Sequence, residues 1–562
     1  MTEINDEKIK AYALENAIKY KGKANQGAVL AGLFSEGLEK SQVKDHIPRI
    51  QKIIAEINEL SEEGQKVELQ NLGINTSKRK IREGLPELPN AKRGQVMMRF
   101  APFPSGPLHI GNARTLILND EYAKMYDGKL IFVMDDTIGS EAKPIEPEAY
   151  DLIKEGADFL EINYDKKIIY KSDRIEKYYD YAEKLLDKGY LYVCDCSAEE
   201  RQKNKIEGKE CSCRQFNAEE QLKRWKEMFK AEVGSMCVRL KTDMQDPDPA
   251  FRDRIMFRIS DRPHAKLGKK FRVYPLLDFS WAIDDHELGI THIVRGMELA
   301  IETRVEKFIW DIFEWPHAEV VYNGHFAIEG IKISKSKGAQ EVKSGQYIGW
   351  NDPRMWSIQS LRDRGITAEA IRQFVLNMGI NKTSIKVPVE VLYSLNKKIV
   401  EESPRYFFIQ DPKKIKIKGC PKIKAKIPRH PNGTLGYKEY ETNQEFLIAS
   451  KDLNHMKSEY YRLMHLLNFE SDDVGRILAH NFSFISEDPD PGLEAKYIHW
   501  LPANADNIEI EILMDDGSTI KGLGEPELKT LKAGTIVQFE RFGFVRLYKK
   551  HKDKLEFWFA HK

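Results

Sequence analysis

The most constraining feature of the chain is a strand, a glycine-rich loop, a helix and a second strand in direct succession. A short apolar run, VMMRF at residues 96–100, precedes a loop rich in proline and glycine, APFPSGPLHIGN at 101–112. A helical pattern runs from residue 113 to about 125, stops at Gly128, and is followed by LIFVM at 130–134. Two short strands joined through a helix form a βαβ unit, which requires a parallel sheet. The sequence therefore predicts an α/β fold in this region.

The chain is too long for one hydrophobic core, and its pattern changes along its length. With 562 residues it should form several domains. Apolar residues recur at helical spacing through residues 1 to about 72, and a basic, proline-containing stretch at 74–95 suits a linker. Beyond about residue 405 strand patterns dominate, with a hairpin signal at Asp516-Gly517, and predict one or two β-barrels.

The composition argues against a disordered or membrane-spanning chain. Apolar residues make up 41% and charged residues 31%, which is a globular balance. No stretch approaches the roughly 18 apolar residues of a membrane helix. The N-terminus is charged and lacks an apolar signal core, so we expect a cytoplasmic protein with no membrane partner. The net charge of +1 argues weakly against nucleic-acid binding, but lysines can gather on one face of a large protein.

The loop PFPSGPLHIGNART at 102–115 is a candidate phosphate site. It joins a strand to a helix, where open α/β sheets bind phosphate ligands. Gly106 and Gly111 allow close approach of the backbone, and a helix beginning near Asn112 offers N–H groups and the positive end of a dipole. His109 would donate a hydrogen bond to a phosphate oxygen as charge develops there. Taken alone, His-Ile-Gly-Asn is more typical of a structural turn with a buried histidine.

The segment KISKSKG at 332–338 is a second candidate phosphate-binding loop. Its lysines act as point charges on phosphate and its serines add hydroxyl donors. Taken alone, it is an ordinary solvated loop. His-Ile-Gly-Asn followed about 220 residues later by Lys-Ile-Ser-Lys-Ser, however, resembles the paired signatures of class I aminoacyl-tRNA synthetases. This chain departs from the family pattern at Asn112, which replaces a second histidine, and at Ile333, which replaces methionine.

This resemblance implies a Rossmann-like catalytic domain that transfers AMP from ATP, with Mg²⁺, to an amino acid. Displacement at phosphorus is catalysed mainly by positioning and charge stabilisation. By resemblance His109 contacts ATP phosphate, and Lys335, with Lys332, stabilises the leaving pyrophosphate. The catalytic residues implied are His109, Lys332 and Lys335, and the ATP-binding residues are Gly106, His109, Gly111, Asn112, Ser334, Lys335 and Ser336.

The resemblance narrows to the glutamyl/glutaminyl branch, in its archaeal and eukaryotic form, and covers nearly the whole chain. It implies that Arg99 faces the substrate side chain and that Asp135 pairs with the substrate α-ammonium. Arg295 lies where glutamyl enzymes resemble one another in having arginine and glutaminyl enzymes usually have cysteine, so glutamate is favoured. Leu277 replaces a tyrosine that often contacts substrate, and Val133 replaces an arginine before the acidic pair.

Two cysteine pairs predict a structural zinc site. Cys194 and Cys196 precede Cys211 and Cys213 by a spacer at residues 197–210. Cysteines two apart on an extended segment point the same way, so both pairs together would supply a tetrahedral set of four thiolates. The alternative is a group of free buried cysteines. Glutamyl enzymes can carry such a zinc site, which would pin the insertion that binds the tRNA acceptor end.

The expected RNA partner is the glutamate tRNA, and the sequence leaves open whether the glutamine tRNA is also charged. In KKIKIKG at 413–419, Lys414, Lys416 and Lys418 would share one strand face while Ile415 and Ile417 enter the core. This face would follow an RNA backbone, as the anticodon-binding barrels of the branch do, or it would protect an edge strand. The N-terminal helices are expected to bind a protein partner.

We therefore expect six regions and one principal activity. The activity is ATP-dependent activation of L-glutamate and its transfer to the 3′ end of tRNA. The alternatives are a glutaminyl-tRNA synthetase and a non-catalytic tRNA-binding protein. The regions are a helical extension and linker (1–90), two halves of the catalytic domain (91–190 and 256–345), an acceptor-end-binding insertion (191–255), a helical stem-contact region (346–400) and anticodon-binding β-barrels (401–562).

Overall fold

The computed structural model describes residues 5–20, 22–35, 38, 42–73, 84–138, 143–165, 167–331, 335–456, 459–471 and 481–562, without the side chains of residues 31, 35 and 335–337. The chain divides into two compact units, Met1–Gly84 and Leu85–Lys562. This division lies close to the predicted end of the N-terminal extension. The other domain limits stay predictions. No helix within the described ranges is long and apolar enough to cross a membrane.

The first unit is helical over its described residues, as the apolar spacing predicts. Its core includes Ile9, Leu14, Val29, Ile50 and Ile57. The side-chain nitrogen of the buried Gln65 on the fourth helix donates to the carbonyls of Ile57 and Leu60, which ties this helix to the end of the third. The helices are α1 (Asp6–Lys19), α2 (Gln26–Ser35), α3 (Val43–Asn58) and α4 (Glu62–Leu72).

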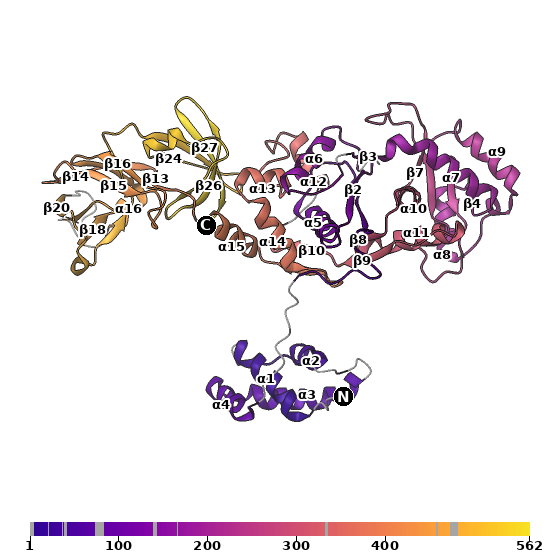
Figure 1. Ribbon diagram of the computed structural model, residues 1–562, viewed down its shortest axis with the longest axis horizontal. Helices are drawn as coiled ribbons and strands as arrows, with labels where there is room; N and C mark the ends of the chain where they lie inside the picture. Colours follow the sequence, from indigo (N-terminus) through magenta and orange to yellow (C-terminus); the bar gives the residue numbers. More distant parts are fainter. Residues whose placement is uncertain are drawn as a thin grey trace. The chain divides into compact units, whose positions relative to one another are not determined.

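The second unit contains the predicted parallel sheet (Figure 1). Strand β1 (Met97–Phe100) pairs in parallel with β2 (Lys129–Met134), which pairs with β3 (Ile169–Tyr170). On the other side of β1 lies β8 (His292–Gly296), which pairs in parallel with β9 (Glu319–Asn323). The Thr291 amide donates to the Met97 carbonyl at 2.9 Å, which ties the two sets of strands together. The α/β prediction is confirmed.

The chain runs from β1 through a helix to β2 on one side of β1. It returns to the other side of β1 only later, at β8. Helix α5 (Ile110–Met125) follows β1 and packs against β1, β2 and β8. The gap between the carboxyl ends of β1 and β8 is therefore a topological switch point, the place where open α/β sheets bind ligands.

A four-stranded antiparallel sheet follows the third parallel strand and forms its own core. Helices α7 and α9 pack against its first strand, and the buried core includes Trp225, Phe257 and Trp310. The strands are β4 (Leu191–Cys194), β5 (Cys237–Leu240), β6 (Ile255–Ile259) and β7 (Val273–Pro275), and the helices after β3 are α7 (Ile175–Asp187), α8 (Ala198–Glu207), α9 (Ala218–Met228), α10 (Leu277–Glu287) and α11 (Ala300–Ile312). Helix α6 (Ala149–Phe159) precedes β3 and packs in the core of the parallel sheet.

Helices connect the parallel sheet to the C-terminal β-structure (Figure 1). The buried guanidinium of Arg364 donates to the carbonyls of Phe559 and Ala560 at 3.1 and 2.9 Å, so this helix is fixed to the last strand. The elements are α12 (Lys335–Lys343), α13 (Ile358–Arg364), α14 (Ala368–Met378), α15 (Val389–Val400) and the parallel pair β10 (Phe326–Ile328) and β11 (Ile385–Val387).

The C-terminal region forms two seven-stranded sheets, each nearly closed into a barrel. One has the order β12-β25-β26-β27-β23-β24-β13, and only Phe407 separates its two edge strands in the chain. The other has the order β21-β18-β19-β20-β14-β17-β22, and only His499 and Trp500 separate its edges. Adjacent edge strands bring each sheet back on itself around a filled core. The predicted barrels and the Asp516-Gly517 hairpin are confirmed.

The strands of these sheets have the following bounds. The first sheet contains β12 (Arg405–Tyr406), β13 (Phe408–Gln410), β23 (Ile508–Leu513), β24 (Thr519–Gly524), β25 (Ile536–Phe539), β26 (Gly543–Lys550) and β27 (Lys554–His561). The second contains β14 (Pro412–Lys418), β17 (Glu445–Ala449), β18 (Tyr460–Leu463), β19 (Leu467–Ser471), β20 (Phe482–Ser486), β21 (Lys496–Ile498) and β22 (Leu501–Pro502). A separate hairpin pairs β15 (Lys424–Pro428) with β16 (Tyr437–Glu441), and α16 (Ser450–Asn454) follows β17.

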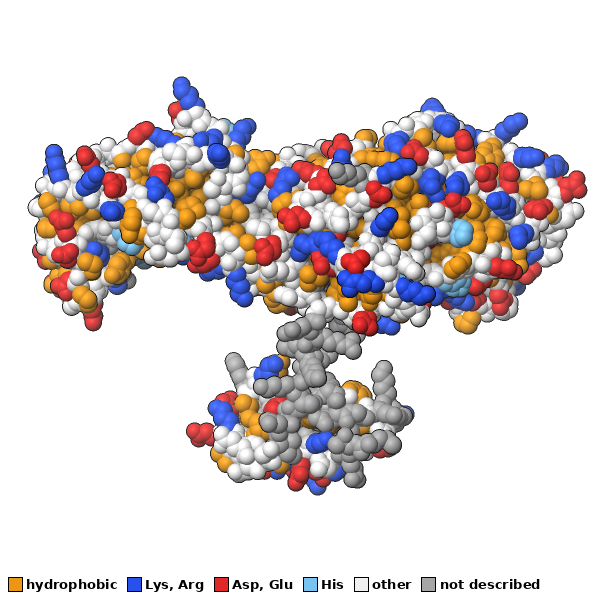
Figure 2. All heavy atoms as spheres, viewed as in Figure 1, with side chains coloured by type: hydrophobic (Ala, Val, Ile, Leu, Met, Phe, Trp, Pro, Cys, Tyr) orange, Lys and Arg blue, Asp and Glu red, His pale blue; other side chains and the backbone are white. Residues whose placement is uncertain are grey.

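The lysine-rich strand alternates as predicted, but it is not an edge strand. In β14 the side chains of Ile415 and Ile417 are buried, while Lys414, Lys416 and Lys418 are exposed. The strand pairs with β17 on one side and with β20 on the other, so the edge-protection interpretation is wrong. Elsewhere basic and acidic side chains are intermingled on the visible surface, in keeping with the near-neutral net charge (Figure 2).

A buried ion pair stabilises the contact between the β15–β16 hairpin and the first barrel. The Glu525 carboxylate accepts from Lys438 at 2.9 Å, from Tyr440 at 2.7 Å and from the Phe407 amide at 2.6 Å, and both charged side chains are 1% exposed. We expect Glu525→Gln to cost about 3–5 kcal/mol, because it strands a buried ammonium. Calorimetry of the full chain should show a lowered transition temperature. The double variant K438M/E525Q should recover part of the loss, and equal loss in both would contradict the pairing argument.

Candidate active site

A cavity of about 340 Å³ lies at the switch point, at the carboxyl ends of β1, β2 and β8. It brings together Arg99, Asn112, Asp135 and Arg295, which lie far apart in the chain. Leu277, at the position of the family tyrosine, also lines it. The full lining is Arg99, Phe100, Ala101, Pro102, Phe103, Asn112, Thr115, Asp135, Lys143, Leu277, Trp281, Val294, Arg295, Gly296, Glu298 and Leu299.

Arg99 is held by an acid that the sequence analysis did not identify. Its Nε and Nη2 donate to the two carboxylate oxygens of Asp285, and the pair is almost fully buried. Burial would lower the pKa of Arg99, but Asp285, Glu306 and Asp135 raise it overall. Nη1 has no hydrogen-bond partner among the described residues. Arg99 therefore keeps its charge and offers one N–H edge to a ligand in the cavity.

Arg295 occupies a similar position on β8. Its Nη1 donates to both carboxylate oxygens of Glu306 at 2.9 Å and to Thr303 at 3.0 Å. Its Nε and Nη2 have no hydrogen-bond partner in the described part of the chain. Burial raises the pKa of Glu306 to about 7, against the attraction of Arg295. The Arg295–Glu306 ion pair therefore lies beside the cavity with burial opposing the charged form of its carboxylate.

The Trp281 ring lies among three cations. The guanidinium carbons of Arg99 and Arg295 lie 4.5 and 4.8 Å from its centroid, and the ammonium of Lys171 lies 5.2 Å away. Aromatic faces attract cations, so the indole helps to hold this concentration of positive charge in a buried place. The guanidinium N–H groups that keep no hydrogen-bond partner among the described residues suit an acidic ligand.

Asp135 sits directly after β2 and is paired with a buried lysine. The Lys171 ammonium lies 3.1 Å from Asp135 Oδ1 and donates to Ser280 at 2.9 Å. The neighbouring Asp136 accepts from the amide and hydroxyl of Ser172 at 2.9 and 2.8 Å, and burial raises its pKa. Asp135 thus lines the cavity, whereas Asp136 holds the loop.

The helix after the glycine-rich loop begins earlier than predicted. Helix α5 starts at Ile110, not near Asn112, because His109 caps it. The ring Nδ1 accepts from the amides of Gly111 and Asn112 at 3.1 and 3.2 Å, and Asn112 Oδ1 accepts from the His109 amide. A neutral ring that accepts at Nδ1 carries its proton on Nε2. The expected free amide at Asn112 is therefore occupied, and His109 is a donor through Nε2.

Glycine is needed at the two predicted positions, 106 and 111, for different steric reasons. A Cβ on Gly111 would lie 2.9 Å from His109 Cε1, so any side chain there would displace the capping ring. Gly106 has φ 143° and lies against the Trp350 ring, 3.1 Å from where a Cβ would be. Both positions need glycine for the loop to keep its form.

The lysine loop is only partly described. Lys332 and Ser334 lie outside the described residues, and α12 begins at Lys335, although the side chains of Lys335 and Ser336 are not described. Glu146 links the far end of α12 to the glycine-rich loop: Lys343 donates to its carboxylate at 2.6 Å, and its amide donates to the Pro104 carbonyl. The roles of the lysine loop stay predictions.

Several residues that hold the cavity's side chains in place escaped the sequence analysis. Asp285, Glu306, Lys171 and Trp281 contact the predicted residues from α10, α11 and the turn after β3. The one available signal was Asp284-Asp285, two acids in a segment that is otherwise largely apolar. Such acids are buried only when they are paired.

The four predicted cysteines form one cluster. Their sulfurs all lie within 4.8 Å of one another, with Cys194 3.9 Å from Cys211 and Cys196 3.8 Å from Cys213. Zn–S bonds of about 2.3 Å in a tetrahedron place sulfurs about 3.8 Å apart. The donor set and its spacing therefore fit zinc. The cluster joins the end of β4 to the turn before α9 and would hold the insertion rigid.

We expect the purified protein to carry about one zinc per chain if this cluster is a metal site. Substituting both Cys196 and Cys213 by serine should abolish the bound metal and lower the thermal stability of the insertion. Elemental analysis measures the first effect and limited proteolysis the second. The matched control is C420S, at a buried cysteine in the second barrel. If the wild type contained no metal and the double variant kept its protease resistance, the cysteines would have no role in metal binding.

Comparison with known proteins agrees with this geometry. A family described as tRNA synthetases class I (E and Q), catalytic domain, matches residues 95–402, and the corresponding anticodon-binding domain descriptions match residues 403–484 and 497–548. The glutamate–tRNA ligase of Methanocaldococcus jannaschii is 40% identical over 99% of this chain and 100% of that protein. The glutamate–tRNA ligase of Pyrococcus abyssi is 40% identical over 98% of each.

A solved structure of a glutamate tRNA ligase from Elizabethkingia meningosepticum is more distant, at 18% identity, with a TM-score of 0.40 over 55% of this chain and 70% of that one. The family match spans more than half of the chain, and both archaeal relatives match it almost from end to end. These matches agree with the parallel sheet, the switch-point cavity and the C-terminal barrels. The chain belongs to the class I tRNA synthetases of the E and Q type.

Proposed function

We propose that the protein is a glutamate–tRNA ligase. Two buried arginines and an aspartate line a single cavity at the switch point, and this arrangement carries the proposal. Arg99 and Arg295 suit a side-chain carboxylate, and Asp135 suits an α-ammonium. Relatives at about 40% identity over the whole chain bear the same name.

The reaction has two steps. An α-carboxylate oxygen of glutamate attacks the α-phosphorus of ATP, which enters as its magnesium complex, and the bond to pyrophosphate breaks. The terminal ribose hydroxyl of tRNA then attacks the acyl carbon of glutamyl-adenylate, its proton is lost, and AMP leaves with the electron pair. The protein's contribution is orientation and charge stabilisation, with no covalent enzyme intermediate.

The proposed roles follow the position of each group. His109 donates through Nε2 to ATP phosphate, and Lys335, with Lys332, stabilises the leaving pyrophosphate. The glycine-rich loop and the lysine loop cradle the nucleotide through Gly106, Gly111, Asn112, Ser334 and Ser336. Support comes from the capping of α5 by His109 and from Glu146, which accepts from Lys343 at the end of α12 and donates its amide to Pro104 in the glycine-rich loop.

The remaining parts of the proposal concern binding partners, the metal and the cellular location. We assign residues 1–90 to a protein-binding extension, 191–255 to the acceptor end of tRNA, and 346–400 and 401–562 to the stem and anticodon. The four cysteines would hold structural zinc. The protein would act in the cytoplasm, where charged tRNA is used.

Aminoacylation with separated tRNAs tests the proposal. Purified glutamate and glutamine tRNAs are each incubated with ATP and with either amino acid. We expect glutamate to be attached to the glutamate tRNA. The glutamine tRNA shows whether the enzyme also attaches glutamate to a second tRNA. Attachment of glutamine instead would indicate the glutaminyl alternative. No ATP consumption with either pair would indicate a non-catalytic tRNA-binding protein.

A further inference from the structure

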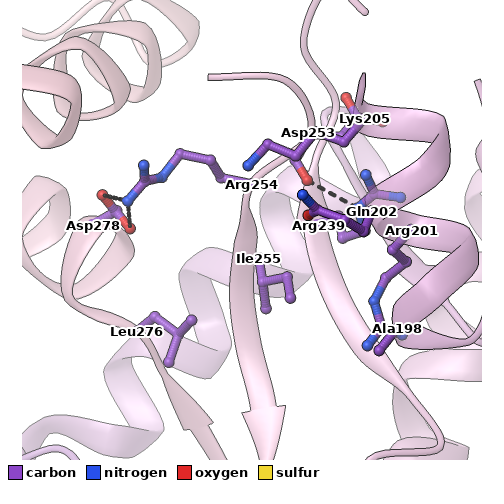
Figure 3. Close-up of a pocket in the computed structure, with 10 residues that line it drawn as sticks. All are labelled: Ala198, Arg201, Gln202, Lys205, Arg239, Asp253, Arg254, Ile255, Leu276 and Asp278. Atoms are coloured by element: carbon purple, nitrogen blue, oxygen red, sulfur yellow. Dashed lines mark hydrogen bonds and ion pairs between the residues drawn. The ribbon is translucent and has the colours of Figure 1, made fainter. Parts of the chain in front are cut away.

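A single arginine beside the four-stranded sheet bridges the starts of two helices. Arg254 lies directly before β6, in the wall of a second cavity of about 440 Å³, and points toward Asp278 (Figure 3). Its Nη2 donates to both carboxylate oxygens of Asp278, at 3.0 and 3.1 Å, and to Glu302 at 3.1 Å. Asp278 lies in the first turn of α10, and Glu302 lies in the first turn of α11. One nitrogen atom therefore joins both helix starts.

The two carboxylates need this cation. Their side chains are only 6% and 13% exposed, and α10 packs against α11. Burial raises the pKa of Asp278 against the attraction of Arg254, and the Glu302 carboxylate raises it further. Without Arg254, two buried like charges would lie close together, which is unfavourable. The arginine itself is held in place, because the Leu240 amide in β5 donates to its carbonyl at 2.8 Å.

The first of these helices carries the groups that hold Arg99. Asp278, Trp281 and Asp285 recur at helical spacing, so they share one face of α10. Asp285 accepts from Nε and Nη2 of Arg99, and the Trp281 ring lies 4.5 Å from the guanidinium carbon. Leu277, next to Asp278 in the chain, lines the active-site cavity itself. A shift of the start of α10 would therefore move Arg99 and one wall of the cavity.

The second helix carries the groups that hold Arg295. Glu306 lies one turn after Glu302, on the same face of α11. Arg295 donates to Glu306 at 2.9 Å and to Thr303 at 3.0 Å, and the Arg295–Glu306 pair is almost fully buried. Arg254 is thus linked to both arginines of the active-site cavity, to each through a different helix, although it does not line that cavity.

We propose that Arg254 is a positioning residue for recognition of the amino acid. It fixes the starts of α10 and α11, and so it fixes the distance between the guanidiniums of Arg99 and Arg295. Two arginines bind one carboxylate well only when their N–H groups converge on its oxygens. The proposed nucleotide-binding loops follow β1 and precede α12, so the effect should fall on the amino acid and not on ATP. This inference rests on the proposed function, because it assumes that both arginines bind the substrate carboxylate.

Charging of glutamate tRNA by the full protein tests the inference. Arg254→Met removes the bridging nitrogen and keeps much of the apolar stem. We expect R254M to raise the KM for glutamate about tenfold, as for one lost hydrogen bond to a charged group, and to leave kcat and the KM for ATP within about twofold. Arg254→Lys should recover most of the affinity for glutamate, because one nitrogen makes all three contacts and an ammonium can replace it.

The matched control is Arg304→Met. This variant breaks another ion pair of α11, between Arg304 and Asp246, in which the arginine side chain is 45% exposed. It should leave the KM for glutamate unchanged, because exposed pairs contribute little. If R254M is too unstable to assay, Glu302→Ala takes its place: it keeps the pair between Arg254 and Asp278, releases α11 alone, and should raise the KM for glutamate about threefold.

Three results would overturn the inference while leaving the proposed function intact. They are an unchanged KM for glutamate in the assayed variant, an equal rise in the KM values for glutamate and ATP, and an equal rise in the Arg304→Met control. In each case the wild type would still charge glutamate. A wild type that charges no glutamate would instead overturn the proposed function, and the inference with it.

Discussion

Substitution of His109 by asparagine should reduce the rate of glutamyl-adenylate formation about 100- to 1,000-fold, the usual effect of losing one donor to a developing charge. Asparagine is a good helix N-cap, so it can take over the acceptor role of Nδ1 toward the Gly111 and Asn112 amides. It cannot reach as far as Nε2. The variant therefore separates the donor from the cap. Pyrophosphate exchange in the presence of tRNA measures the rate.

The control for this prediction is His109→Ala, which removes both functions. It should show the same loss of rate and, in addition, a loss of about 0.5–2 kcal/mol in stability from the missing cap. Thermal unfolding distinguishes the two variants. If asparagine at 109 retained a rate within about threefold of the wild type, the histidine would be only a cap, and the proposed phosphate contact would be wrong.

The fold was predictable where local pattern and geometry agree. The strand, loop and helix at 96–125 required a parallel sheet, and that sheet is present. The helix start was misplaced because the capping residue is a histidine, whereas serine, threonine, aspartate and asparagine are the usual caps. The alternation of β14 was predictable, but its interior position depends on β17 and β20, which follow later in the chain.

The site was predictable only in part, because its charges are balanced by distant residues. The resemblance identified Arg99, Asp135 and Arg295, and all three line the cavity. Their partners could not be predicted, since Asp285 lies 186 residues from Arg99 and meets it only through packing of α10 against the sheet. Single-sequence patterns report which residues are buried, and they do not report which buried charges pair.

Replacement of Arg295 by cysteine, the residue usual in glutaminyl enzymes, should lower kcat/KM for glutamate about 10- to 100-fold, the effect of losing one or two hydrogen bonds to a charged group. In the structure Arg295, which lines the cavity, has two nitrogens with no hydrogen-bond partner among the described residues, one of them 4.0 Å from Asp285, and a third that binds Glu306. Loss of the guanidinium removes positive charge where the side-chain carboxylate would lie. Charging of glutamate tRNA over a range of glutamate concentrations measures the effect.

The interpretation needs a second variant, because Arg295 also neutralises Glu306. The folded pKa of Glu306 is about 7, above the usual 4.5 of an unfolded glutamate, so the folded state takes up a proton as pH falls through 7. The stability that this group contributes is therefore present at low pH and lost as pH rises through 7. Without Arg295 the isolated carboxylate should make the loss at high pH larger.

The double variant R295C/E306Q should therefore unfold with a flatter dependence on pH than R295C, while charging glutamate no better. Glutamine in place of Glu306 keeps the size of the side chain and removes the charge that Arg295 balances. If the double variant still charges glutamate poorly, Arg295 acts on the substrate. If the double variant recovered glutamate charging to the wild-type level, Arg295 would serve only to neutralise Glu306, and the preference for glutamate would rest on Arg99 alone.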